Sequence, residues 1–127
     1  MTPNEQIPLF NGGVEEDLQQ INKFINEEEY RSKDKKNIIG GIQKLNFKNS
    51  YIFFDVGEPP NKGFSKSYQS GPLSFEYYLD GNKIITNCGF GCNISSKAEL
   101  LSRLTSAPST LTLNDTSVTN FERNRLI

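Results

Sequence analysis

The chain has 127 residues with 14 basic and 15 acidic side chains, which leaves a formal net charge of -1. That length suits one small domain, and that charge balance favours neither nucleic acid nor an anionic membrane surface as a partner. Histidine is absent, so triad hydrolysis and most zinc sites, which rely on imidazole, are hard to build.

Residues 1–37 are expected to form an N-terminal segment with a helix and a charged linker. The start "MTPNEQIPLF" has neither a charged n-region nor an apolar h-region, so no signal peptide is predicted and the compartment stays open. Acidic residues follow shortly after "GG", and negative charge is favourable at the N-terminus of a helix. We predict an amphipathic helix over residues 14–26, because apolar residues recur at helical spacing: Val14, Leu18, Ile21 and Ile25.

From Ile38 onward the spacing becomes that of β-structure. The segments "IIGGIQKLNF" and "SYIFFDVG" are apolar, β-branched or aromatic, and "KNS" and "GEPPNKG" bound them. This pattern predicts two short strands followed by a loop. We expect Ile42 and Leu45 to pack inward, and we interpret Asp55 as a turn former rather than a catalyst. The apolar runs are too short to cross a bilayer, so no membrane insertion is predicted.

The segment "LSFEYYLDGNKIITN" carries the clearest local signal. Residues 73–80 alternate between apolar and more polar side chains, and Asp80-Gly81 joins them to a second strand over residues 83–87. We predict a β-hairpin. Glu76 and Tyr78 lie on its more polar face, where solvent is the expected neighbour and a ligand is the alternative.

The two cysteines, Cys88 and Cys92, follow in "CGFGC". We expect a small buried side chain at Cys88 and a loop thiol at Cys92. A local disulfide in an oxidising compartment is an alternative, and a zinc pair without histidine is a weaker one.

The C-terminal part adds one helix and one strand. Ser96 is the expected N-cap, with Glu99 three residues later, of a short helix over Lys97–Thr105. The alternation in "STLTLND" predicts a strand with Leu111 and Leu113 inward. The predicted fold is mainly β: residues 38–127 form an incomplete antiparallel β-sandwich, with an N-terminal helix and one short helix in the chain.

Three blocks of this region resemble a known family: "GGIQKLNFKNSYIFFDVGEPP", "SGPLSFEYYLDGNKIITNCG" and "APSTLTLNDTS". Their order and spacing are similar to those in the C-terminal β-sheet domain of the heparinase II/III family of polysaccharide lyases. "PLFNGG" also resembles a segment just upstream in bacterial members. The resemblance implies an enzyme whose α/α toroid and β-sandwich share one site, which cleaves uronic-acid-containing polysaccharides by β-elimination. It implies an acidic polysaccharide and the toroid of the same polypeptide as partners, in the periplasm or cell envelope.

The resemblance also indicates where site residues would lie. Two family histidines correspond to Ser67 and Gln69, an aspartate that helps to hold zinc corresponds to Asn87, and a further histidine corresponds to Pro108. These are poor or impossible zinc ligands, so we expect no metal, no cofactor and no catalytic residue in this chain. The candidate substrate-binding residues are Ser67, Tyr68, Gln69 and Asn87, since hydroxyl, amide and aromatic groups suit sugars.

Two hypotheses about function result. The first is the β-sandwich part of a heparinase II/III-like lyase, inactive as the isolated chain. The alternative is a non-catalytic carbohydrate-binding or structural remnant domain, in which the hairpin framework persists for folding alone.

Overall fold

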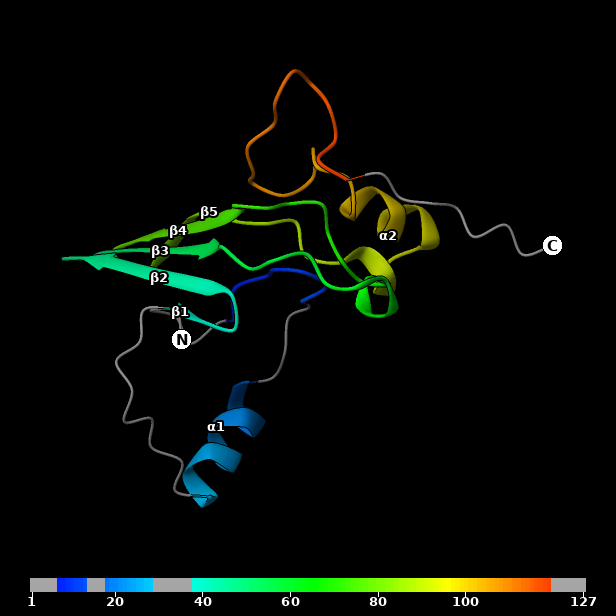
Figure 1. Cartoon of the computed structure of the whole chain (residues 1–127). Coiled ribbons are helices and arrows are strands. Elements are labelled where there is room, and N and C mark those ends of the chain that lie inside the picture. Colours follow the sequence, from blue (N-terminus) through cyan, green and yellow to red (C-terminus); the bar gives the residue numbers. More distant parts are fainter. Residues whose placement is uncertain (1–6, 14–17, 29–37, 120–127) are drawn as a thin grey trace.

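The computed structural model describes residues 7–13, 18–28 and 38–119. A five-stranded antiparallel sheet in the order β1-β2-β3-β4-β5 forms its centre (Figure 1). The strands span Ile38–Ile39, Ile42–Phe47, Ser50–Asp55, Phe75–Leu79 and Asn82–Ile85. The mainly β prediction is confirmed. The described residues form one sheet, and a second sheet of a sandwich is not among them.

The first predicted strand is in fact a hairpin. Gly40 and Gly41 have φ of 58° and 80°, a conformation that glycine adopts at little cost. The chain therefore reverses, and Ile39 of β1 lies opposite Ile42 of β2. A side chain at Gly41 would also collide with Gly57, because an added Cβ would lie 2.8 Å from the Gly57 Cα. The prediction of one strand here was wrong, since the diglycine turn outweighs the continuous apolar pattern.

The predicted hairpin of residues 73–87 is confirmed. Asp80 and Gly81 both have positive φ, 49° and 80°, as a two-residue turn of the type favoured in hairpins requires. Leu79 of β4 then pairs with Asn82 of β5, and the register shifts between Tyr77 and Tyr78. The turn chemistry, read from two residues, determined this part of the topology.

The sheet has two unlike faces, because residues directly opposite each other in antiparallel strands project to the same side. The register places Lys44, Asn46, Tyr51, Phe53, Asp55, Glu76 and Tyr78 on one face, here called the covered face. It places Leu45, Phe47, Ile52, Phe54, Phe75, Tyr77 and Leu79 on the other, here called the open face.

Burial of the two faces is the reverse of the sequence expectation. On the covered face, Glu76 and Tyr78 are 0% exposed and Phe53 is 5% exposed. On the open face, Leu45 is 43% and Phe47 is 72% exposed. The predictions that Leu45 packs inward and that Glu76 and Tyr78 face outward were wrong. The alternation of the strands was right, but the side on which other segments pack was not.

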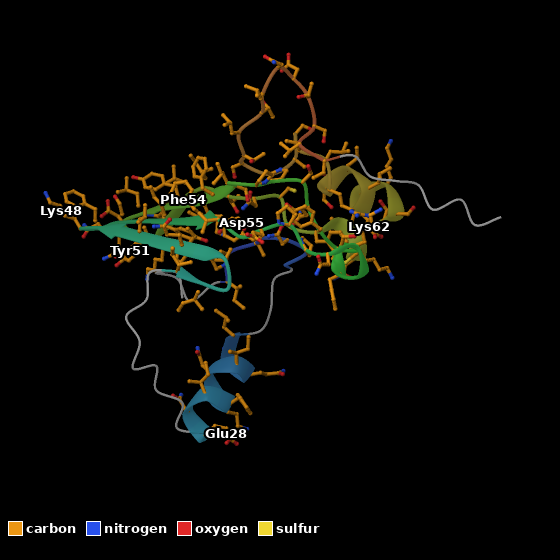
Figure 2. The ribbon with its side chains drawn as sticks, in the orientation of Figure 1. Glu28, Lys48, Tyr51, Phe54, Asp55 and Lys62 are labelled. Carbon is orange, nitrogen blue, oxygen red and sulfur yellow. The ribbon has the colours of Figure 1, made fainter. Side chains whose placement is uncertain are left out.

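An N-terminal segment, residues 7–13, reaches the covered face (Figure 1). Leu9 N donates a hydrogen bond of 3.2 Å to Glu76 Oε1. Asn11 Nδ2 donates one of 2.5 Å to Asp55 Oδ2. Figure 2 shows Asp55 at the end of the sheet opposite Lys48. The buried acidic side chains of β3 and β4 therefore hold a segment more than forty residues away in sequence.

The two α-helices lie outside the sheet (Figure 1). Helix α1 spans Leu18–Glu27 and has no buried residue. It confirms the predicted helix where the two ranges overlap, while Val14 lies outside the described residues. Helix α2 spans Ser96–Ser102, and Ser95 caps it by accepting a hydrogen bond from Ala98 N. The predicted cap at Ser96 and end at Thr105 were therefore wrong. None of the described helices is long and apolar enough to cross a membrane.

The predicted strand over residues 109–115 was also wrong. This segment belongs to a loop that projects from the sheet (Figure 1), and its only strand-like feature is an isolated bridge between Leu113 and Thr116. Leu111 and Leu113, expected inward, are 69% and 71% exposed. Alternating leucines favour a strand only where a neighbouring strand pairs with them, and here the loop turns back on itself instead.

Candidate functional site

The candidate residues gather at one end of the sheet, and Gln69 lies at their centre. Its side chain is buried, with 3% exposed. Gln69 Nε2 donates hydrogen bonds to Gly89 O at 2.8 Å and to Ser102 O at 2.9 Å. Gln69 Oε1 accepts one from Gly12 N at 3.1 Å. One amide thus joins the N-terminal segment, the chain after β5 and helix α2.

Asn87 holds a second contact between distant segments. Its Oδ1 accepts hydrogen bonds from Ser109 N at 2.9 Å and from Ser109 Oγ at 3.1 Å. Its backbone N donates to Glu76 Oε1 at 3.3 Å. The Nδ2 atom is buried and has no hydrogen-bond partner among the described residues. An unpaired buried donor costs free energy. The other hydrogen bonds of Asn87 must therefore offset this cost and keep the side chain in place.

Tyr68 is buried, and Ser67 is exposed. The pKa of Tyr68 is raised, first by burial of the phenol and then by the negative charge of Asp55. The phenol therefore stays protonated near neutral pH and is not a general base there. Ser67 lies against Gly12, where an added Cβ would come within 2.8 Å of the Ser67 Cβ.

The four candidates lie close together in the fold, and of the four only Ser67 is exposed. Ser67 and Gln69 both contact Gly12, Gln69 contacts Gly89, and Asn87 lies two residues before Gly89. Their role in substrate binding stays a prediction. What the geometry shows directly is that Gln69 and Asn87 hold loops together.

The positions that correspond to family zinc ligands do not fit a metal ion. Both ends of the Gln69 amide and the Oδ1 of Asn87 are engaged by protein groups. Pro108 offers no donor, and its ring packs on Gly71, where an added Cβ would lie 2.7 Å from Pro108 Cγ. Among the described residues there is no group of three or more His, Cys, Asp or Glu side chains that could hold a metal.

The two cysteines are free thiols, and both are exposed. The expectation of a buried Cys88 was therefore wrong. Its Sγ donates a hydrogen bond to Gly89 O at 3.2 Å, and desolvation raises the pKa of the thiol. A raised pKa leaves little thiolate at neutral pH, so Cys88 is a poor nucleophile.

Glu76, which the sequence pattern did not mark as a site residue, is the centre of the covered face. Glu76 Oε1 accepts hydrogen bonds from Leu9 N and from Thr86 Oγ1, the latter at 3.1 Å. Glu76 Oε2 accepts one of 2.6 Å from the Tyr78 hydroxyl and lies 3.7 Å from Lys83 Nζ. Burial, followed by the bond to Glu76, raises the pKa of Tyr78. No local signal marks this role, because its donors come from three separate segments.

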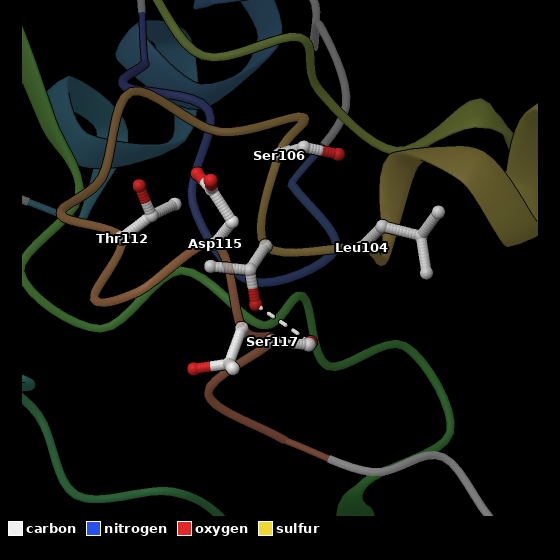
Figure 3. A pocket seen from close by; sticks show the side chains of 7 residues that line it. Leu104, Ser106, Thr112, Asp115 and Ser117 are labelled. Atoms are coloured by element: carbon white, nitrogen blue, oxygen red, sulfur yellow. Dashed lines mark hydrogen bonds between the residues drawn. The ribbon is translucent and has the colours of Figure 1, made fainter.

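A cavity of about 570 Å³, which no sequence motif indicated, lies beside the end of α2 (Figure 3). The side chains that line it are mainly hydroxyl-bearing: Leu104, Thr105, Ser106, Thr112, Asp115, Thr116 and Ser117. The segment 109–115 had been interpreted as a strand, and that interpretation concealed the cavity.

Comparison with known proteins gives one match. The family model described as "Heparinase II/III-like, C-terminal" matches residues 34–127. No curated protein matches the chain, and no solved structure matches it.

Proposed function

The chain belongs to the heparinase II/III-like family through its C-terminal domain, and on this premise we propose that it is the β-sheet part of a polysaccharide lyase. In the complete enzyme it would form one wall of a cleft in which an acidic polysaccharide is cleaved by β-elimination. The observation that carries the proposal is the network of hydrogen bonds made by Gln69 on one side and by Asn87 and Glu76 on the other, which gives the end of the sheet a defined shape.

The isolated chain is proposed to be inactive. β-Elimination at a uronate needs a group that neutralises the carboxylate, a base for the C5 proton and an acid for the leaving oxygen. Around the network, Tyr68 and Tyr78 are held protonated. Asp55 and Glu76 are buried and accept hydrogen bonds from the protein. The base and the acid are therefore assigned to the α/α toroid.

The four candidate residues are proposed to serve binding in two ways. Ser67 is exposed and would donate a hydrogen bond to the saccharide. Tyr68, Gln69 and Asn87 are buried and would act mainly by holding the loops around Ser67. This division makes Ser67 the position at which binding can be altered with the least effect on folding.

The open face supports the proposed partner. Leu45 and Phe47 of β2 and Leu79 of β4 expose apolar surface on the same face of the sheet, with β3 between the two strands. Exposed apolar surface gathered on one face marks a contact surface. The occupant proposed for it is another part of the same polypeptide, with the toroid as the candidate that the family implies.

A non-catalytic carbohydrate-binding domain is the second candidate. It is favoured by the four positions that do not fit a metal, since a decayed catalytic site can retain sugar contacts. The two functions share binding and differ in whether a completed enzyme produces unsaturated uronate.

The test is to incubate the chain with uronate-containing polysaccharides and to measure retention and ultraviolet absorbance together. We expect retention without a rise in absorbance. Ser67→Ala should weaken retention about threefold to tenfold, the factor for one hydrogen bond. Ser96→Ala, at an exposed serine of α2, is the matched control.

A rise in absorbance would overturn the proposed inactivity. The absence of retention on every polysaccharide would overturn the binding role.

A further inference from the structure

The cavity beside α2 has two walls (Figure 3). Leu104, Thr105 and Ser106 follow α2, and Thr112 with residues 115–117 forms the opposite side. A cavity of about 570 Å³ falls within the range of roughly 300–1,000 Å³ that small-molecule sites occupy. It has the size for a single sugar ring.

The wall that carries Asp115 is held in place by a tight turn. Asn114 and Asp115 have φ of 52° and 53°, a conformation that Asn and Asp tolerate better than other residues with a side chain. Thr116 N donates to Leu113 O at 3.1 Å and closes the turn. A turn of this kind fixes the backbone at Asp115 before any ligand arrives, which lowers the entropic cost of binding.

The turn is also fastened to the rest of the fold. Thr105 Oγ1 lies 2.9 Å from Ser117 Oγ and 2.7 Å from Ser70 Oγ. Val118 N donates to Thr105 Oγ1 at 3.1 Å. Thr105 therefore connects the cavity to Ser70, the neighbour of Gln69, and places the cavity next to the candidate site.

The polar groups of the cavity fall into two classes. Thr105, Thr116 and Ser117 use their hydroxyls in bonds to the protein. The side chains of Ser106, Thr112 and Asp115 have no such bond to the described residues and so remain for a ligand. Asp115 is the one charged residue of the lining.

We propose that this cavity binds a neutral sugar residue through its hydroxyl groups. A carboxylate accepts hydrogen bonds from two sugar hydroxyls, and the hydroxyls of Ser106 and Thr112 both donate and accept. A uronate would bring its carboxylate against Asp115 without a cation in the lining, and that repulsion disfavours it. The inference rests on the proposed polysaccharide binding and adds a selective position to it, next to the loop that carries Ser67.

A matched pair of ligands tests the proposal. Methyl glucoside and methyl glucuronide differ only at C6, so their comparison isolates the acid group. Titration of the full chain, followed by amide chemical shifts, should move signals of residues 104–106 and 112–117 with the glucoside and much less with the glucuronide.

Two variants and one control accompany the titration. Asp115→Asn keeps the size of the side chain, and asparagine tolerates the same turn conformation. It should lower the affinity for the glucoside about threefold to tenfold, and it should reduce the difference in affinity between the glucoside and the glucuronide. Thr112→Ala should weaken the glucoside about threefold. Glu58→Gln makes the same kind of change at an exposed loop residue outside the lining and should alter nothing.

Signals that stay unmoved by the glucoside, or an equal response to the glucuronide, would overturn the cavity assignment. If acidic polysaccharides are retained while the amide signals of the cavity residues do not move with the glucoside, this inference fails and the proposed function stands. If the glucoside binds in the cavity while no acidic polysaccharide is retained, the proposed function fails and the cavity stands as a sugar site.

Discussion

The covered face of the sheet buries a carboxylate, whereas the open face exposes leucine and phenylalanine. A half-covered antiparallel sheet commonly shows the opposite arrangement, with apolar residues inward. The buried carboxylate of Glu76 is stabilised because it accepts hydrogen bonds from Leu9, Thr86, Asn87 and Tyr78. A buried charge is tolerated when hydrogen bonds replace its water. The difference teaches that burial here follows available donors as much as hydrophobicity.

The largest expected effect on stability comes from truncating an aromatic residue of the covered face, with the open face as the comparison. Phe53→Ala removes a buried ring that packs edge-on against Tyr78 at 5.8 Å, and it should lower the free energy of unfolding by about 3–5 kcal/mol. Phe47→Ala, one strand away on the open face, should change it by less than about 0.5 kcal/mol. Urea unfolding measures both. Equal losses would show that the open face is covered in solution.

Glu76→Ala should lower the free energy of unfolding by about 3 kcal/mol, because donors from three segments are left without their acceptor. The value lies at the lower end of the range for broken buried pairs, since Lys83 can regain water. Glu58→Ala, at an exposed glutamate, is the control. A loss below about 1 kcal/mol would show that water replaces the network.

Tyr78→Phe should cost about 2 kcal/mol by deleting the bond to the Glu76 carboxylate. It should also change the alkaline pH dependence. The pKa of Tyr78 in the fold lies above its unfolded value of about 10, so the folded state keeps the proton that the unfolded state loses. Its stabilisation is complete below about pH 10 and declines as the pH rises further.

Above about pH 10, the melting temperature should therefore fall less steeply with pH in Tyr78→Phe than in the unaltered chain. A residual slope is expected from Tyr68, whose pKa is raised in the same direction. Identical slopes of melting temperature against pH in the two proteins would show that Tyr78 does not cause the alkaline loss of stability.

The smallest effect on stability is expected from Phe47→Ser combined with Leu79→Ser on the open face. The free energy of unfolding should change by less than about 0.5 kcal/mol per site, while self-association at high concentration should decrease because the apolar patch shrinks. Sedimentation velocity measures the association, with Asn46→Ser as the control on the other face. Unchanged association in the double variant would mean that the patch is not a contact surface.

Local turn chemistry carried most of what could be predicted. Asp80-Gly81 was sufficient for the hairpin of β4 and β5 because two adjacent positive φ values leave few other turns. Gly40-Gly41 contained the same information for β1 and β2, and the apolar run around it hid the signal. The segment 109–115 misled because alternation alone does not supply a pairing strand.

The family resemblance grouped Ser67, Gln69 and Asn87, and their role in binding stays a prediction. In the structure Ser67 and Gln69 meet at Gly12, while Asn87 bonds to Ser109 and Glu76. The burial of Gln69 and Asn87 could not be foreseen, because it depends on Gly12, Ser102 and Ser109, which lie far away in sequence. The cavity beside α2 depends equally on a long-range bond, from Thr105 to Ser70.

By itself the sequence determined the mainly β class, the hairpin of β4 and β5, the alternation along the strands and the helix within residues 18–26. These follow from backbone preferences and side-chain periodicity, which act over a few residues. Only the tertiary structure decided which face of the sheet is buried. That choice depends on the N-terminal segment reaching Glu76 and Asp55 across the fold, and periodicity along a strand cannot state which of its two sides another segment will cover.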